Sequence, residues 1–195
     1  MIIGIQCGRG SANERACDEF CRKNNISDYQ IKYLISTENV LKELNQDKID
    51  LGTFAVKSSR IGLVKETQEA IKKYPFEKID EIDLEIYHVF LGIKRLNKEQ
   101  YHQIISPPHA LKEHKEHIKK QYPNAKLIKS KDMGLAARKL KEGKYDCNTL
   151  IISLKDCAEI YQLKVIEDNL PTNKGYVTTF YLVKKSSDLG NHKLD

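Results

Sequence analysis

Short apolar runs alternate with amphipathic stretches along most of this chain. The apolar runs are rich in Ile, Val, Leu, Tyr and Phe and have the length of buried strands. They predict strands over residues 2–6, 29–35, 49–56, 82–92, 104–106, 126–129, 149–153 and 176–183. The stretches between them have apolar residues at helical spacing and predict helices over 13–22, 36–44, 63–74, 108–122, 135–142 and 154–163. This alternation predicts an α/β fold class.

The strand and helix succession ends at Pro75 and then starts again, which indicates two lobes. We expect a first lobe of residues 1–80 plus 168–195 and a second lobe of residues 81–167. Residues 82–92, one long strand or a strand pair, and residues 165–169 are interpreted as the two crossings. A chain that leaves one lobe and returns to it builds a cleft with a hinge.

Composition and charge narrow the class of protein. The 195 residues are 40% hydrophobic and 31% charged, which is ordinary for a globular protein. No apolar run is long enough for a bilayer and the N-terminus lacks a signal-peptide pattern, so we expect a cytoplasmic protein without membrane contacts. The net charge is +6, but Lys alternates with Glu and Asp, which favours small anionic ligands over nucleic acid.

The cysteines and histidines do not predict a metal. The five Cys are odd in number and lack CxxC spacing, so we expect free thiols. His114 and His117 lie one helical turn apart, a spacing that can hold a metal, but no third ligand is evident. We therefore expect a solvated helix face there and no metal. His88 and His109 are better placed for a cleft, and packing or capping explains them equally well.

Polar loops follow two of the predicted strands, and another leads into the last strand. Ser11 and Asn13 come after the first strand, where a helix N-terminus presents free N–H groups and binds anions, although helix capping alone explains them too. The polar stretch 57–60 follows the third strand, at the edge where open α/β sheets bind ligands. Thr178 and Thr179 open the last strand and must face opposite ways, although Thr is also simply a good strand former.

Several segments match motifs of one enzyme family. The family turn G-P-x-G-[ST]-[FY]-S matches residues 7–13 loosely, and G-V-V-P-I-E-N-S-x-x-G-x-V corresponds to residues 52–64. The family motif L-x-V-L-A-x-N-I-x-D-x-x-x-N-x-T-R-F runs onto residues 163–180 without a gap, keeping Asn169, Thr178 and Phe180. With these matches the chain resembles the catalytic domain of prephenate dehydratases over almost its whole length.

The resemblance implies a two-lobed fold like the type 2 periplasmic binding proteins, and the loss of water and carbon dioxide from prephenate in phenylalanine biosynthesis. Thr178 would be the catalytic proton donor or would orient the departing hydroxyl. The implied substrate-binding residues, which would hold a small dicarboxylate, are Ser11, Asn13, Lys57, Ser58, Ser59, Arg60, Asn169 and Thr179. No cofactor is implied, and the family usually forms homodimers.

Two departures from the motifs keep other functions open. The Arg beside the catalytic Thr of the family is Thr179 here, and P-I-E-N-S is Ala55–Ser59, so that Lys57 replaces Glu. A Thr cannot restore the bidentate carboxylate clamp of an Arg. The alternatives are a prephenate decarboxylase-type relative that does not aromatise its substrate and a non-catalytic module that binds a small anion.

Overall fold

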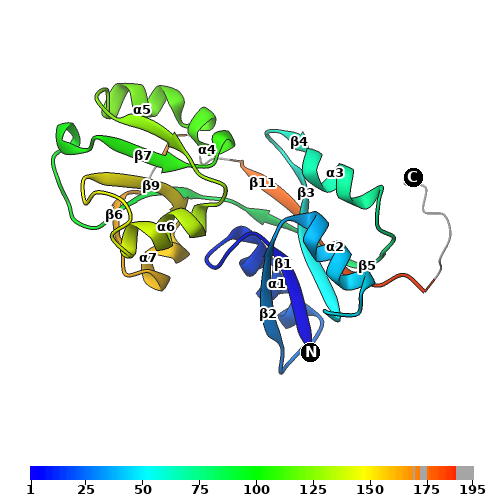
Figure 1. Cartoon of the computed structure of the whole chain (residues 1–195). Coiled ribbons are helices and arrows are strands. Elements are labelled where there is room, and N and C mark those ends of the chain that lie inside the picture. Colours follow the sequence, from blue (N-terminus) through cyan, green and yellow to red (C-terminus); the bar gives the residue numbers. More distant parts are fainter. Residues whose placement is uncertain (169, 172–174, 188–195) are drawn as a thin grey trace. The chain divides into compact units, whose positions relative to one another are not determined.

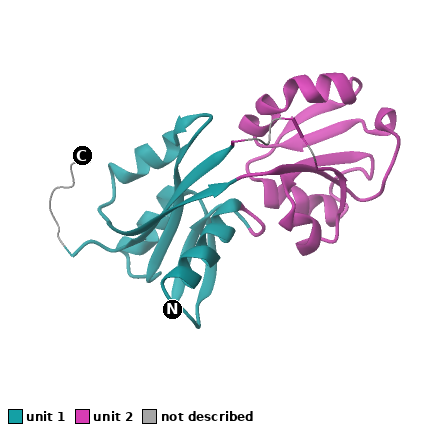
Figure 2. Ribbon diagram, turned by 180° about the vertical axis from the view of Figure 1, so that it is seen from behind, with its two compact units in different colours: residues 1–8, 12–85, 176–195 teal, residues 9–11, 86–175 magenta. Residues whose placement is uncertain are grey.

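The computed structural model describes residues 1–168, 170–171 and 175–187, and these residues form two compact units. Unit 1 comprises residues 1–8, 12–85 and 176–195, and unit 2 comprises residues 9–11 and 86–175 (Figure 2). Each unit has its own mixed sheet, which confirms the predicted α/β class. The domain limits 1–80, 81–167 and 168–195 stay a prediction.

Unit 1 is built on a sheet with the strand order β2-β1-β3-β11-β5, and β4 pairs with β3 at its side (Figure 1). Its elements are β1 (Ile2–Gln6), α1 (Ala12–Lys23), β2 (Gln30–Ile35), α2 (Thr37–Asn45), β3 (Leu51–Ser58), β4 (Gly62–Leu63), α3 (Lys65–Ile71), β5 (Glu77–Glu85) and β11 (Val177–Lys184). Strand β1 is parallel to β2 and β3, whereas β11 is antiparallel to β3 and β5.

Two apolar layers cover the faces of this sheet. On one face, Ile3 and Ile5 of β1 pack with Cys17 and Cys21 of α1. On the other face, α2 and α3 pack against a cluster that includes Phe54, Val56, Tyr181 and Val183. Because strand side chains alternate, Tyr181 and Val183 place the odd-numbered residues of β11 toward α2 and α3, and the even-numbered residues lie on the α1 face.

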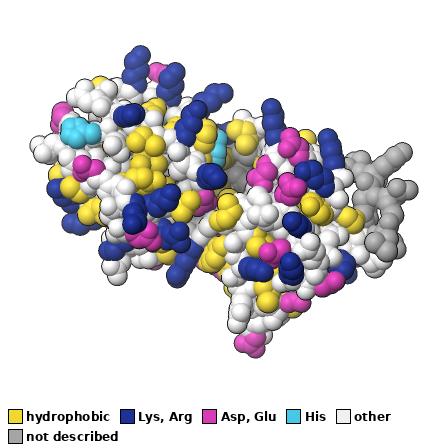
Figure 3. Space-filling view, viewed as in Figure 1, with side chains coloured by type: hydrophobic (Ala, Val, Ile, Leu, Met, Phe, Trp, Pro, Cys, Tyr) yellow, Lys and Arg dark blue, Asp and Glu magenta, His cyan; other side chains and the backbone are white. Residues whose placement is uncertain are grey.

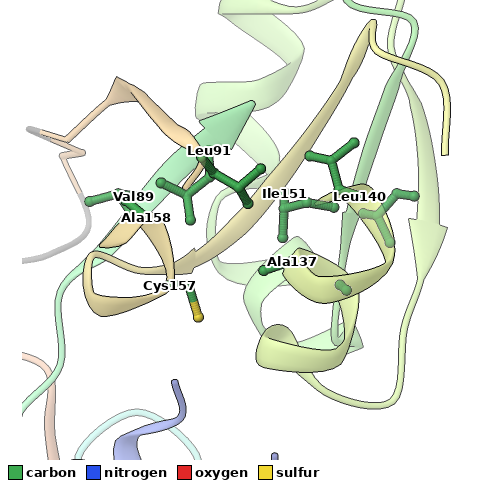
Figure 4. Packing of buried hydrophobic residues seen from close by; sticks show 10 residues of the cluster. Val89, Leu91, Ala137, Leu140, Ile151, Cys157 and Ala158 are labelled. Atoms are coloured by element: carbon green, nitrogen blue, oxygen red, sulfur yellow. The ribbon is translucent and has the colours of Figure 1, made fainter. Parts of the chain in front are cut away.

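Unit 2 is built on a sheet with the order β10-β6-β9-β7-β8. Its elements are β6 (His88–Gly92), the 3₁₀ helix η1 (Lys98–Gln100), β7 (Gln103–Ser106), α4 (Pro108–Glu113), α5 (Lys115–Gln121), β8 (Lys126–Lys129), α6 (Met133–Lys141), β9 (Thr149–Leu154), α7 (Asp156–Ile160) and β10 (Lys164–Glu167). One face packs against α6 and α7 through residues that include Leu91, Ala137, Leu140, Ile151 and Cys157 (Figure 4). The other face packs against α4 and α5.

Several predicted elements are divided or differently bounded. The run 82–92 is two strands, because β5 pairs with β11 in one sheet and β6 pairs with β9 and β10 in the other. The predicted helix 108–122 is two helices that meet at His114. Residues 164–167 form a strand that the apolar pattern alone did not indicate. Sequence periodicity does not reveal which hydrogen-bond partner a strand will find.

The positive side chains are dispersed over the surface, as the alternation of Lys with Glu and Asp in the sequence predicted. On the face shown in Figure 3, Lys and Arg side chains are spread over the surface and interspersed with carboxylates, and they do not gather into one stripe. Among the described helices, none has both the length and the apolar character needed to cross a membrane.

Candidate functional site

Thr178 and Ser58 form a buried pair of hydroxyls in unit 1. Thr178 is the second residue of β11 and pairs directly with Ser58, the last residue of β3. Directly paired residues of antiparallel strands project from the same face, so the two side chains lie on the α1 face. Thr178 is 7% exposed and Ser58 3% exposed. Within the described residues, the Thr178 hydroxyl makes no side-chain hydrogen bond, whereas the Ser58 oxygen accepts one from Arg60 N at 3.3 Å.

Asn13 brings a buried amide to the N-terminal turn of α1, on the same side of the sheet. Its side chain is buried and donates from Nδ2 to Cys7 Sγ at 3.6 Å. Its Oδ1 atom is buried and finds no hydrogen-bond partner in the described part of the chain. Since buried polar atoms are nearly always hydrogen-bonded, this oxygen is an acceptor suited to a hydroxyl or another ligand donor.

Ser59 and Arg60 hold the start of β11 in place. Ser59 N donates to Val177 O at 2.9 Å, and Val177 N donates to Ser59 Oγ at 3.1 Å. The Arg60 guanidinium lies over the ring of Tyr176, 5.1 Å from its centroid. These contacts fix the two residues that precede Thr178, and they place Arg60 beside the start of the strand in which Thr178 lies.

Lys57 and Thr179 project from the opposite face of the sheet. They are paired across β3 and β11, one position away from the Ser58 and Thr178 pair. Thr179 Oγ1 donates to Asp83 Oδ1 at 2.6 Å, and Lys57 is exposed. The structure therefore brings Thr178, Ser58 and Asn13 to one face and directs Thr179 away from that face.

Ser11 is buried and belongs to unit 2, together with Arg9 and Gly10. Two side-chain donors hold this three-residue segment: Cys157 Sγ donates to Gly10 O at 3.3 Å, and Tyr161 Oη donates to Arg9 O at 3.1 Å. Burial is the main cause that raises the pKa of Tyr161, so its hydroxyl stays protonated and able to donate at neutral pH. The predicted ligand Asn169 lies outside the described residues.

A polar network that the sequence did not reveal fixes the ends of β1, α2 and α3. Gln6 is buried, donates from Nε2 to Glu66 Oε2 at 2.9 Å and accepts from Ala55 N at 3.1 Å. Glu66 Oε1 accepts from Thr37 N at 2.6 Å, so its carboxylate lies at the N-terminus of α2, where the helix dipole favours negative charge. The Thr67 hydroxyl donates to Ala55 O at 2.7 Å and lies within hydrogen-bond distance of Thr37 Oγ1, at 2.9 Å.

Backbone strain occurs at the carboxyl ends of β1 and β2. Cys7 and Ile35 have φ values of 69° and 67°, which are uncommon for residues with a side chain and especially so for β-branched Ile. The turn at Ile35 is closed by Ser36 N, which donates to Leu34 O at 2.7 Å, and Cys7 N donates to Ile35 O at 3.1 Å. Such strain tends to gather at binding and catalytic sites, which agrees with a site at this edge.

The histidines of unit 2 lie differently from the prediction. His114 is 0% exposed, so the expected solvated helix face is wrong for this residue; it lies where α4 and α5 meet and turns inward. His88 Nδ1 and His114 Nε2 are 3.0 Å apart, and Glu113 lies beside both rings. His109 remains exposed as a whole, yet desolvation on its packed side is the main cause that lowers its pKa. Glu113 directly precedes His114 in the sequence, and this adjacency was the available signal that a carboxylate would lie beside His88 and His114.

Comparison with known proteins identifies the family. The family model described as prephenate dehydratase matches residues 3–188. A prephenate dehydratase of Methanocaldococcus jannaschii is 29% identical over 185 residues, which cover 94% of this chain and 65% of that protein. The chain thus spans slightly less than two thirds of the length of this relative.

Solved structures agree on the fold. The prephenate dehydratase of Arthrobacter aurescens, solved in complex with L-Phe, matches with a TM-score of 0.81 at 18% identity. The match covers 99% of this chain and 62% of the Arthrobacter aurescens chain. A periplasmic substrate-binding protein of an ABC transporter from Coxiella burnetii matches with a TM-score of 0.53 at 14% identity. The match covers 96% of this chain and 86% of the transporter protein. The predicted likeness to periplasmic binding proteins is thereby confirmed, and the match of the family model over residues 3–188 shows that this chain belongs to the prephenate dehydratase family.

Proposed function

We propose that this chain catalyses the decarboxylating dehydration of prephenate to phenylpyruvate, with Thr178 as the catalytic group. The observation that carries the proposal is the Thr178 hydroxyl itself. It is buried at the start of β11, lies opposite Ser58, and makes no side-chain hydrogen bond with any described residue. A hydroxyl on a largely buried side chain that has no internal partner is suited to a partner on the substrate.

The reaction needs little more than a positioned proton donor. The bond from ring carbon to carboxylate carbon breaks, and its electron pair moves into the ring as carbon dioxide leaves. The ring then expels the C4 hydroxyl, which takes a proton and departs as water, giving an aromatic product. Thr178 Oγ1–H donates that hydrogen bond or proton as the C–O bond breaks, and a proton from solvent restores the hydroxyl. A threonine is a weak acid in water, so its contribution depends on placement in a desolvated site.

The replacement of the family Arg by Thr179 leaves the face around Thr178 intact. Thr179 projects from the other face and is bound to Asp83 at 2.6 Å. The Thr178 face retains Ser58 and the Asn13 amide. This separation supports dehydration as the first candidate, with Asn13, Ser58 and Arg60 as proposed contacts of the dicarboxylate.

The same replacement favours a second candidate. A Thr cannot supply the bidentate clamp of an Arg, and Lys57 provides only a point charge. If the C4 hydroxyl is not activated, decarboxylation without aromatisation is the outcome, as in prephenate decarboxylase-type relatives. For either reaction we propose a cytoplasmic homodimer, for which light scattering coupled to size-exclusion chromatography measures the mass.

The test is incubation of the purified protein with prephenate at neutral pH, with quantification of carbon dioxide and of both organic products. Formation of phenylpyruvate is the expected result. Release of carbon dioxide with the hydroxyl retained would establish the second candidate. Binding of prephenate without either product would overturn both reactions and leave a small-anion-binding module.

Matched variants test the role of Thr178. Thr178→Val removes the hydroxyl at nearly constant volume, and we expect kcat to fall by about 10²–10⁴, the range for a lost proton-transfer group. Thr178→Ser keeps the hydroxyl and should retain most of kcat. Thr179→Val is the control on the opposite face and should change kcat by less than about tenfold, because its hydroxyl contacts Asp83. Unchanged turnover in Thr178→Val would exclude the proposed role.

A further inference from the structure

We propose that His88, Glu113 and His114 form a three-ligand site for a zinc ion within unit 2. The three side chains each offer one ligand atom, and these atoms all lie within 4.8 Å of one another. The three residues belong to unit 2, whereas Thr178 belongs to unit 1, and the inference goes beyond the proposed reaction. The site does not use the pair of His114 and His117; it joins His114 to the neighbouring Glu113 and to His88 from strand β6.

The distances between the ligand atoms fit a tetrahedral zinc ion. His88 Nδ1 and His114 Nε2 are 3.0 Å apart, and Glu113 Oε1 lies 3.6 Å from each of them. Ligands placed about 2.0–2.1 Å from a zinc ion at tetrahedral angles are about 3.3–3.4 Å apart. The observed triangle brackets that separation, so an ion enters with shifts of a few tenths of an ångström in each side chain.

The fold holds the three ligands rigidly. His88 begins β6 and pairs with Leu154 of β9, while Glu113 ends α4 and His114 joins α4 to α5. The interruption of the helix at His114 lets two adjacent residues reach the same point. The ring of Phe90 packs against that of His114 at 6.3 Å and 65°, which limits the rotation of the imidazole.

Burial favours an ion over a solvated ion pair. The side chains of His88, His114 and Glu113 are 1%, 0% and 8% exposed. A carboxylate at this depth is costly unless a positive charge compensates it. Zn²⁺ compensates the charge while the two imidazoles, in their neutral form, donate lone pairs to it.

The ligand set selects the kind of metal. Two imidazole nitrogens and one carboxylate bind zinc with a tetrahedral arrangement and Fe(II) with an octahedral one, whereas Mg²⁺ and Ca²⁺ prefer oxygen ligands throughout. Three protein ligands leave a fourth position for water, as in other sites with two His and one Glu. The competing interpretation is a metal-free cluster in which one ring nitrogen donates a hydrogen bond to the other.

The experiment uses the full chain, stripped with a chelator, dialysed and titrated with Zn²⁺ alone. We expect about one zinc per chain by elemental analysis, and a rise in the melting temperature because the ion binds only the folded state. Co²⁺ in place of Zn²⁺ should give the intense visible absorption of a tetrahedral site. His88→Gln and His114→Gln should abolish both signals.

Two further variants keep the inference falsifiable even if the histidine variants unfold. Glu113→Gln changes only one charge at the edge of the cluster and should weaken zinc binding by more than about a hundredfold, above the range for groups that merely support a ligand. His102→Gln is the control, because His102 is exposed and lies outside the cluster. Equal zinc content and equal affinity in Glu113→Gln, His102→Gln and the unmodified protein would overturn the site, as would absence of zinc binding by the unmodified protein.

Discussion

Replacing Gly10 by Ala perturbs the segment that joins β1 to α1 in two separable ways. Gly10 has a φ of 81°, a conformation that L-residues with a side chain rarely adopt. A Cβ atom at this position would also lie 2.6 Å from Cys157 Sγ and 3.3 Å from Ile160 Cδ1. The first distance is far inside van der Waals contact, so the Cys157 side chain, α7 or the segment itself has to move.

Three contributions, which differ in magnitude and sign, make up the expected change in the free energy of unfolding. The left-handed conformation costs an Ala about 1–2 kcal/mol. The reduced freedom of the unfolded chain returns about 0.4–1 kcal/mol. Overpacking against Cys157 adds about 1–3 kcal/mol. We therefore expect Gly10→Ala to lower the free energy of unfolding by about 1–5 kcal/mol in total.

Gly143→Ala isolates the conformational part. Gly143 has a similar φ of 71°, and among the described residues nothing lies within 4 Å of the Cβ that it would carry. Gly10→Ala should thus be more destabilising than Gly143→Ala by about 1–3 kcal/mol, the steric part alone. Urea unfolding followed by circular dichroism, with linear extrapolation, measures both values.

A second substitution tests the steric cause directly. Cys157→Ala removes the sulfur that the new Cβ would meet, so the double variant should recover most of the steric cost, and the double-mutant cycle should give a coupling of about 1 kcal/mol or more. The reasoning is refuted if Gly10→Ala costs no more than Gly143→Ala, or if Cys157→Ala does not reduce its cost.

Three further predictions concern other parts of the chain. Hydrogen bonding from Lys23 is the main cause that lowers the pKa of Asp80. The ionised carboxylate therefore stabilises the folded protein above pH 3.8, the ordinary pKa, and this stabilisation is lost as the pH falls through the folded-state pKa. Asp80→Asn should therefore cost about 0.2–1 kcal/mol at neutral pH and nothing in strong acid, and an equal cost at both pH values in urea titrations would contradict this. Burial is the main cause that raises the pKa of the Cys17 thiol, whereas Cys147 is exposed. A thiol reagent at mildly alkaline pH should therefore label Cys147 first, which mass spectrometry measures. Equal labelling rates of Cys17 and Cys147 in the folded protein would contradict this prediction. Thr67→Val leaves the buried Thr37 hydroxyl without its acceptor and the Ala55 carbonyl without its donor, and it should lower the free energy of unfolding by about 1–3 kcal/mol; a cost below about 0.5 kcal/mol would show that the network is not stabilising.

Local patterns in the sequence were sufficient for the elements and for some of their ends. Ser36 was predicted to open a helix, and its oxygen accepts from Asn39 N at 3.1 Å. The apolar run before residue 184 was predicted as a buried strand and is β11. These features depend on residues that are close in the chain, so periodicity and capping residues report them.

The site residues divide in the same way. The sequence placed Thr178 and Thr179 at the start of a strand and on opposite faces, and β11 has that arrangement. It did not show that Thr179 would be bound to Asp83, 96 residues away. Nor did it show that the Asn13 Oδ1 atom would be buried without a partner, because that depends on how α1 lies against the sheet.

The sequence by itself thus determined the α/β class, most of the strands and helices, and the family through its motifs. The tertiary structure alone decided that the run 82–92 divides between two sheets, that Cys157 approaches Gly10, and that His88 meets His114. The physical reason is that strand pairing, close packing and side-chain clusters join residues far apart in the chain, and local apolar periodicity contains no record of which distant partner each residue will contact.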